Sequence, residues 1–326
     1  MFNSPPDSNP MRGYTIAIIS AIILAFTGIF IRYLTQTYHL PPLVLAFWRD
    51  AFVALTLLPI LGILRATLLR VRREHLWYLM FYGLMLATFN SLLTNAVALD
   101  GAAVATVLVY SSTGFTALLG RWLLKERLDW AKGLVVVLTL GGCVLVADAL
   151  DATAWQVNVV GILTGVTSGL MYAIYTLMGR SASQRGLNPW TTILYTFGFA
   201  AIFLLIINLV FGGLIPGTAT QIADFLWLGD AVIGWSILFA LAAGPTLIGF
   251  GLYNVSLSYL PSSVANLIVT LEPVFTTVIA YFLLGERLAT LQIAGSLMIL
   301  TGVVFLRIYE GRLVNQTGLA LRHRQE

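Results

Sequence analysis

A carboxylate and a proline stand side by side in the middle of an apolar stretch, at Glu272 and Pro273 within residues 262–284. If this stretch crosses a membrane, a charge at its centre costs at least ~2.5 kcal/mol, so we expect Glu272 to face a partner group or a wet cavity. There the carboxylate could bind and release a proton. It could instead be a polar anchor beside the kink that Pro273 causes by removing a backbone donor. Both interpretations stay open.

Arg49 is a second charged group inside an apolar stretch, residues 42–64. At a helical rise of ~1.5 Å per residue, it lies about 10 Å below the start of the stretch. Its guanidinium could hold a substrate carboxylate through two hydrogen bonds. The favoured alternative is an anchor that pairs with a carboxylate of another helix or extends toward the interface. Asp50 is not the expected partner, because adjacent helix residues point in different directions.

Aromatic side chains recur at helical spacing in residues 76–98, and two amides follow them. The series is Tyr78, Tyr82, Met85, Phe89, Asn90 and Asn95. Rings supply contact area and polar tips supply orientation, so the stripe would suit a small amphipathic solute. A packing stripe that ends in an interfacial tyrosine is an equally favoured interpretation. Further candidates of lower weight are Thr106, Tyr110, Thr113, Met171 and Tyr175.

Asn266 is a further candidate for binding. It lies six positions before Glu272, about 240° around a helix at ~100° per residue. The two side chains can face one cavity only if the Pro273 kink redistributes the faces. Gly249 and Gly251 lie within another apolar stretch and suit either close helix packing or hinge motion.

Residue types that enzymes and metal sites need are sparse. The chain has one cysteine, Cys143, and its three histidines, His39, His75 and His323, fall in expected loops or in the tail. The phosphate-loop, zinc-protease, serine-hydrolase and dinucleotide motifs are missing from the sequence. We therefore expect no enzyme, no cofactor and no metal site. The basic residues are dispersed over short loops, so nucleic acid is not an expected partner.

The elements that must position these residues are transmembrane helices. The chain of 326 residues is 59% hydrophobic and 10% charged, whereas an average soluble domain is roughly 25% charged. Apolar runs of about 20 residues, enough to cross a bilayer as a helix, recur without period-two alternation. We predict an all-α membrane protein with ten spans, at residues 13–35, 42–64, 76–98, 101–121, 130–148, 158–180, 190–211, 231–256, 262–284 and 289–307.

The basic residues predict the orientation of these spans. With a cytoplasmic N-terminus, 15 of the 18 Lys and Arg residues fall on the cytoplasmic side. This asymmetry is the one that the positive-inside rule describes. We expect the protein in the cell (inner) membrane, with both termini on the cytoplasmic side. We expect Arg32 and Arg180 to be anchors at span ends.

The sequence also repeats itself. Leu-Leu-Lys-Glu-Arg-Leu at residues 123–128 returns as Leu-Leu-Gly-Glu-Arg-Leu at 283–288, an offset of 160 residues. We predict a tail at 1–11, a five-helix repeat at 12–148, a second at 158–307 and a basic tail at 308–326. Because five is odd, the second repeat must be inverted in the membrane, which is typical of alternating-access carriers with a central cavity.

The motifs carry a resemblance to a known family. They are the repeated Glu-Arg-Leu, Phe-Trp-Arg at 47–49 and Leu-Glu-Pro-Val-Phe at 271–275. With ten spans in two halves, the chain resembles the EamA-domain members of the drug/metabolite transporter superfamily, and is similar to their amino-acid exporters. The Glu-Pro element occurs in the second half only, since Ser111, Ser112 and Thr113 stand at the matching positions.

The resemblance implies a secondary transporter that exports amino acids or related metabolites. The aromatic, cation-poor interior favours neutral amino acids with apolar or aromatic side chains. The alternatives are a multidrug or general metabolite exporter and, from another class, a membrane scaffold without transport. The expected partners are the small-molecule substrate and the lipid bilayer, with protons as a candidate coupling ion through Glu272. The sequence sets no oligomeric state.

Overall fold

The protein is built from helices throughout the part of the chain that the structure describes. A computed structural model describes residues 10–146, 150, 159–215, 217–284 and 289–322. These residues include no β-strand. The all-α prediction is therefore confirmed for them.

The described helices overlap all the predicted spans but differ from several of them in length and continuity. The first half holds α1 (Pro10–Thr37), α2 (Pro42–Arg65), the 3-10 helix η1 (Ala66–Leu69), α3 (Arg73–Tyr110), α4 (Ser112–Leu123) and α5 (Trp130–Val146). The second half begins with α6 (Val159–Gln184), α7 (Pro189–Val210) and the 3-10 helix η3 (Ile222–Leu226). It continues with α8 (Val232–Leu241), the π-helical turn η4 (Ala242–Gly249), α9 (Phe250–Tyr259), α10 (Ser262–Val269), α11 (Glu272–Leu284) and α12 (Thr290–Arg322).

Six helical segments of the described residues are long and apolar enough to cross a membrane. They are Pro10–Thr37, Pro42–Leu69, Arg73–Leu93, Val159–Gln184, Pro189–Val210 and Val232–Tyr259, and shorter apolar helices lie at Trp130–Leu145 and Thr290–Leu306. Large apolar side chains point away from the bundle, including Ile63 at 85% exposure and Trp122 and Phe282 at 77% each. A surface this apolar suits contact with lipid.

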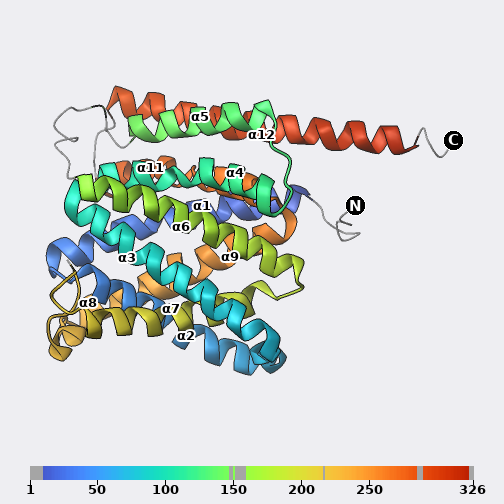
Figure 1. The fold of residues 1–326 in the computed structure, drawn as a ribbon. Helices are drawn as coiled ribbons and strands as arrows, with labels where there is room; N and C mark the ends of the chain where they lie inside the picture. Colours follow the sequence, from blue (N-terminus) through green and yellow to red (C-terminus); the bar gives the residue numbers. More distant parts are fainter. Residues whose placement is uncertain (1–9, 147–149, 151–158, 216, 285–288, 323–326) are drawn as a thin grey trace.

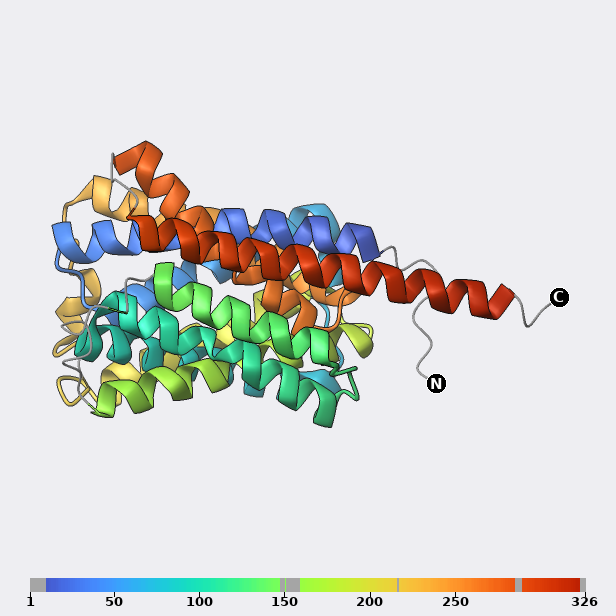
Figure 2. The same ribbon diagram turned by 90° about the horizontal axis from the view of Figure 1, so that it is seen from above.

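The helices lie alongside one another in a bundle (Figure 1). Helix α5 pairs with α12 along one edge, α3 packs against α6 and α7, α2 packs against α7, and α1 packs against α9 and α11. The start of α1 and the end of α12 lie at the same end of the bundle, which we call the terminal end (Figures 1 and 2). Helix α12 extends beyond the bundle there, so residues 308–322 of the predicted tail continue that helix.

Element α3 is not one straight helix over its whole length, Arg73–Tyr110. Phe89 packs against Tyr172 of α6, and Leu108 lies beside Gly165 of the same helix. A straight helix from Phe89 to Leu108 would advance about 28 Å, whereas these contacts move only about 10 Å along α6. The chain therefore reverses between Phe89 and Leu108, which is where we predicted a boundary between two spans.

Two predicted spans are interrupted at or beside a proline. Residues 231–256 form α8, η4 and α9, and Pro245 lies in the π-helical turn between the two α-helices. Residues 262–284 form α10 and α11. A proline clashes with the carbonyl four residues earlier, and for Pro273 that residue is Val269, where α10 ends.

Candidate functional site

A cluster of stacked tyrosines fills the centre of the bundle where α3, α6 and α9 meet. We define the tyrosine cluster as Tyr82, Tyr172, Tyr175 and Tyr253. The ring centroids of Tyr82 and Tyr175 are 4.7 Å apart, those of Tyr172 and Tyr175 are 6.1 Å apart, and those of Tyr172 and Tyr253 are 6.4 Å apart. All four are buried, with at most 6% exposure. Two predicted candidates, Tyr82 and Tyr175, are thus brought into contact from different halves of the chain.

Asn254 joins two of these hydroxyls. The hydroxyl of Tyr82 donates to Oδ1 of Asn254 at 3.2 Å, and Nδ2 of Asn254 donates to the hydroxyl of Tyr175 at the same distance. Asn254 is itself buried. Because an unpaired polar group in a buried site costs about 1–3 kcal/mol, this amide holds the two rings in a defined geometry.

Asn266 reaches the cluster from α10 through Thr176. Its Nδ2 donates to Oγ1 of Thr176 at 3.3 Å, and Thr176 shares a 2.8 Å hydrogen bond with the hydroxyl of Tyr253. Asn266 and Thr176 are both buried. Asn266 thus lies in a buried polar group whose other members are on α6 and α9, and its role in binding stays a prediction.

Glu272 begins α11, directly after the helix break. Its carboxylate lies within hydrogen-bonding reach of the Tyr110 hydroxyl and close enough to Tyr172 for an electrostatic interaction. The helix breaks between Asn266 and Glu272. Glu272 lies near Tyr172, and Asn266 contacts Thr176 on the same helix as Tyr172. Tyr110 and Glu272 were both predicted as site residues, and the structure places them together.

A second polar group lies next to the cluster on α2. Nε of Arg49 donates to Oδ1 of Asp50 at 3.2 Å, and Nδ2 of Asn90 donates to Oδ2 of Asp50 at 3.0 Å. The expectation that Asp50 is not the partner of Arg49 was wrong. A long arginine side chain can bend back along its own helix, and in a buried site the pairing of opposite charges outweighs the diverging directions of neighbouring residues.

The remaining aromatic candidates have packing partners. Phe89 packs against Tyr172 at 5.0 Å between ring centroids, and Met171 is half-buried beside the same core. Tyr78 lies nearer the terminal end, where its hydroxyl donates to the carbonyl of Met178 and the Arg185 guanidinium lies 4.5 Å above its ring. Both interpretations of Tyr78, a binding residue and an interfacial tyrosine, stay predictions.

Gly249 and Gly251 lie at close helix crossings. A Cβ on Gly249 would come within 2.7 Å of the Leu24 side chain, and one on Gly251 would overlap the Trp190 ring. Gly249 is also the last residue of the π-helical turn that contains Pro245. Close packing accounts for both glycines. A hinge at Gly249 stays a prediction, because this residue also belongs to the π-helical turn.

The tyrosine cluster is closed in this conformation. Tyr82, Tyr175 and Tyr253 have no exposed surface, so no water-sized space adjoins their side chains. A solute can reach them only if the surrounding helices separate. The central cavity that the sequence predicts is therefore shut at this level of the bundle.

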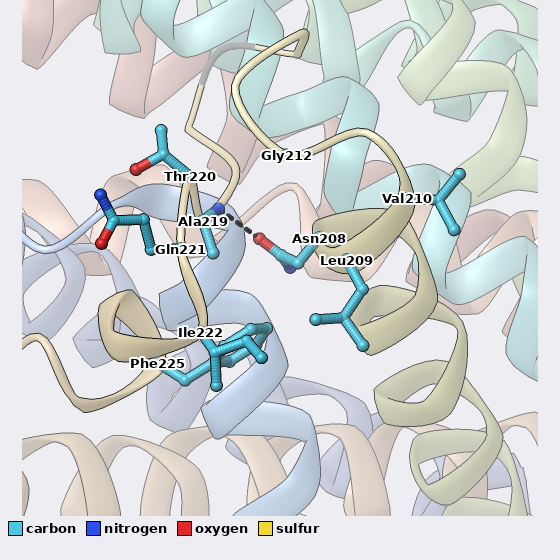
Figure 3. Close-up of a pocket in the computed structure, with 9 residues that line it drawn as sticks. All are labelled: Asn208, Leu209, Val210, Gly212, Ala219, Thr220, Gln221, Ile222 and Phe225. Carbon is cyan, nitrogen blue, oxygen red and sulfur yellow. Dashed lines mark hydrogen bonds between the residues drawn. The ribbon is translucent and has the colours of Figure 1, made fainter.

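An open pocket of about 240 Å³ lies elsewhere, beside the loop after α7 and at the end of the bundle opposite the termini (Figures 1 and 3). It is lined by residues of α7 and of the segment up to η3, among them Asn208, Gly212, Thr220 and Phe225. Oδ1 of Asn208 accepts the backbone N–H of Ala219 at 2.8 Å, so this polar group supports the loop. The pocket is separate from the tyrosine cluster.

The loop beside the pocket is held by further polar contacts. The Thr220 hydroxyl and backbone N–H groups of Thr220 and Gln221 donate to the Asp224 carboxylate, which lowers the pKa of that carboxyl. The indole N–H of Trp48 donates to the carbonyl of Phe225 at 2.6 Å. These contacts stabilise the loop against α2.

The described residues include no group of three or more His, Cys, Asp or Glu side chains that could hold a metal ion. Cys143 is buried and free. The polar groups that the structure assembles are hydroxyls, amides and single carboxylates. Such groups suit reversible binding of a small solute.

Comparison with known proteins identifies the class to which this architecture belongs. Residues 11–147 and 159–308 each match the EamA-like transporter family. The chain belongs to this family. It is therefore an integral membrane protein of a transporter family and not an enzyme.

Individual relatives agree with the family. The chain is 26% identical to an uncharacterized transporter of Synechocystis over 327 residues, covering 91% of this chain and 93% of that protein. It is 27% identical to the threonine/homoserine exporter RhtA of Salmonella typhimurium over 245 residues, covering 74% of each. A solved crystal structure covers 91% of this chain and 97% of its own with a TM-score of 0.72 at 15% identity, which shows the shared fold.

Several residues of the site were missed by the sequence analysis. Asn254 and Tyr253 are adjacent, and Tyr172 and Thr176 lie on the same helix as the predicted Tyr175. An asparagine in the middle of an apolar run is costly in a membrane and could have indicated Asn254. Tyr172 carries no comparable signal, because a tyrosine in an apolar helix is equally typical of packing.

Proposed function

We propose that this EamA-family protein is a secondary transporter that exports neutral amino acids with apolar or aromatic side chains, or related small metabolites, by alternating access. The observation that carries the proposal is the buried network of tyrosines and amides between the two halves. Its members come from α3 in the first half and from α6, α9 and α10 in the second. A site between halves changes its exposure when the halves move relative to each other.

The packing supports two inverted five-helix repeats with ten spans in all. If the halves are related by a two-fold axis in the membrane, helix contacts should occur in symmetry-related pairs, and helices close to the axis should meet their own equivalents. Helix α2 packs on α7, and α5 packs on α12, as the second and fifth spans of each repeat would. The contact of α3 with α6 has its counterpart in the contact of α1 with η4 and α9.

The charge distribution supports cytoplasmic termini. Arg65 at the end of α2, Arg121 near the end of α4 and Arg180 near the end of α6 all belong to the terminal end. Under the positive-inside rule this end faces the cytoplasm. In a bacterium the membrane concerned is the inner membrane.

The site chemistry supports an amphipathic solute. Tyrosine rings provide apolar contact area, Asn254 and Asn266 provide hydrogen-bonding groups, and Glu272 provides a carboxylate for an ammonium group or a proton. The Asp50 carboxylate offsets the charge of the Arg49 guanidinium, which makes this pair a weak site for a strongly anionic solute. The naming of RhtA as a threonine/homoserine exporter agrees with an amino-acid cargo.

A flux experiment tests this proposal. Purified protein in liposomes is given labelled phenylalanine, methionine and threonine, with and without a pH gradient. We expect saturable uptake that unlabelled amino acids inhibit. Uptake of cationic dyes but of no amino acid would support the alternative of a multidrug exporter, and no flux of any solute by folded protein would support a scaffold.

A pair of matched variants locates the binding site. Tyr82→Phe and Tyr195→Phe each delete one hydroxyl, the first from the tyrosine cluster and the second from a contact with the carbonyl of Leu69. We expect Tyr82→Phe to raise KM about fivefold, equivalent to ~1 kcal/mol of binding free energy, and Tyr195→Phe to leave it unchanged. Equal effects of the two variants would place the binding site elsewhere.

A further inference from the structure

Glu126 connects the two halves of the protein at the terminal end. It lies in the segment between α4 and α5, and its carboxylate reaches the start of α10. Oε1 accepts the backbone N–H of Ser262 at 2.6 Å and its hydroxyl at 2.7 Å. Oε2 accepts the backbone N–H of Ser263 at 3.2 Å and its hydroxyl at 2.8 Å. All four donors come from two adjacent residues.

The local backbone is shaped for this contact. Lys125 has a φ of 54°, a left-handed conformation that turns the chain after α4, and the N–H of Glu126 donates to the carbonyl of Gly120 at 3.0 Å. A Cβ on Gly120 would lie 3.0 Å from Oε2 of Glu126 and 3.3 Å from Oγ of Ser262. Glycine therefore leaves the room that the carboxylate occupies.

The contact holds the start of the short helix α10, which also carries the candidate site residue Asn266. Asn266 lies one turn beyond Ser262 on α10, so the two residues lie on the same side of that helix. Helix α10 ends at Val269, just before the break that precedes Glu272. This helix of 8 residues is bounded by Glu126 at one end and by the break at the other, so it can move as a unit.

The corner before α10 is held from a second side. Nη1 of Arg180 on α6 donates to the carbonyl of Leu257 at 2.6 Å, and its guanidinium interacts electrostatically with Glu126. Arg180 was predicted to be an anchor at a span end, and it is turned toward α9 instead of extending outward. The turn from Leu257 to Ser263 is therefore fastened to both halves of the chain.

We infer that Glu126, Ser262 and Ser263 form a latch that keeps the terminal end closed and must release before a solute path opens there. The inference rests on the proposed alternating access. Helix α10 links the latch to Asn266, so solute bound at the cluster and the state of the latch influence each other. The carboxylate also complements the partial positive charge at the start of α10, which favours the latched state.

Thiol labelling of a buried reporter tests the latch without any solute. Cys143 is replaced by alanine, and Ala265, which has no exposed surface, is replaced by cysteine in the full chain. A membrane-impermeant maleimide is then added from each side of membrane vesicles. Because weakening the latch shifts the population toward the open state, we expect Glu126→Gln to speed labelling from the terminal side at least about fivefold.

Glu74→Gln is the matched control, because Glu74 is exposed at the same end and contacts Arg72 and His75 there. It should leave the labelling rate unchanged. If Glu126→Gln fails to fold, Ser262→Ala with Ser263→Ala takes its place, since that variant keeps the carboxylate and both backbone donors.

Each outcome separates the latch from the transport proposal. Unchanged labelling in folded Glu126→Gln, or in the double serine variant, would overturn the latch even if the native protein transports amino acids. Faster labelling from the terminal side in a protein that moves no solute would support the latch and count against the transport proposal. Equal acceleration from both sides would indicate general loosening and would also overturn the latch.

Discussion

Two helix breaks lie at matching positions of the internal repeat, and they differ in the side chains that they carry. At an offset of 160 residues, Ser112 at the start of α4 corresponds to Glu272 at the start of α11. A backbone hydrogen bond recurs at both breaks. The N–H of Ser111 donates to the carbonyl of Leu108 at 3.2 Å, and the N–H of Leu271 donates to that of Ile268 at 3.0 Å.

The difference between the breaks is chemical. The second break carries Glu272 and Pro273, whereas the first carries Ser112 and Thr113. The Ser112 hydroxyl is buried and has no hydrogen-bond partner among the described residues. Because the first break forms without a proline, the repeat architecture itself supports a break here, and the carboxylate is an addition to one half only. This comparison teaches that Glu272 is not needed to build the fold.

The largest expected effect comes from removing that carboxylate. We expect Glu272→Gln to lower proton-driven uptake at least tenfold, ~1.4 kcal/mol in activation free energy, because an amide cannot release a proton. Uptake as a function of the pH gradient measures this. Ser112→Ala is the matched change in the other half and should keep uptake within about twofold of native. A full pH response in Glu272→Gln would make this residue a polar anchor and remove the functional contrast between the breaks.

A smaller effect is expected from Pro273→Ala. The break before Glu272 should persist, because its counterpart at Ser111 exists without proline. We expect uptake to fall less than about threefold, which is at most ~0.65 kcal/mol in activation free energy. Cysteine labelling along residues 267–273 should keep its native pattern. Loss of all uptake together with a changed labelling pattern would show that proline alone creates the second break.

The smallest effect is expected from the hydroxyls at the breaks. The Ser111 hydroxyl donates to the carbonyl of Leu108, and the Thr270 hydroxyl donates to that of Leu267 at 2.6 Å. Ser111→Ala and Thr270→Val should each lower the free energy of unfolding by about 0.5–1 kcal/mol. Unfolding of purified protein in mixed micelles provides the measurement.

Thr15→Val is the control for this pair, since the Thr15 hydroxyl donates to the carbonyl of Met11 on an exposed part of α1. Water can replace that bond, so its loss should change stability by less than either variant at a break. An effect confined to Thr270→Val would show that the two breaks are stabilised by different means.

Prediction from the sequence was most successful where hydrophobic length and periodicity decide the outcome. The helix predicted at 190–211 is found at Pro189–Val210, and the one predicted at 42–64 is found at Pro42–Arg65. The helical spacing of Tyr82 and Phe89 predicts that they share one face, and in the structure both contact tyrosines of α6. Periodicity identifies which residues share one face of a helix, and that information is sufficient to group these two aromatic residues.

Prediction failed where the partner of a side chain is distant in sequence. Asn254 lies 172 residues from Tyr82, and Ser262 lies 136 residues from Glu126. No local pattern relates such pairs. The Arg49 and Asp50 pair failed for the opposite reason, because a local rule about helix geometry neglected the electrostatic gain of pairing charges in a buried site.

The sequence by itself determined that this protein is an all-helical membrane protein with an internal repeat, because apolar length and repeated motifs are properties of the chain. It also singled out Glu272 as costly in a bilayer. Only the tertiary structure decided that Tyr82 and Tyr175 share one amide, that the cluster is closed, and that Glu126 holds the start of α10. The physical reason is that hydrogen bonds act over about 3 Å, and only folding brings residues of the two halves within that distance.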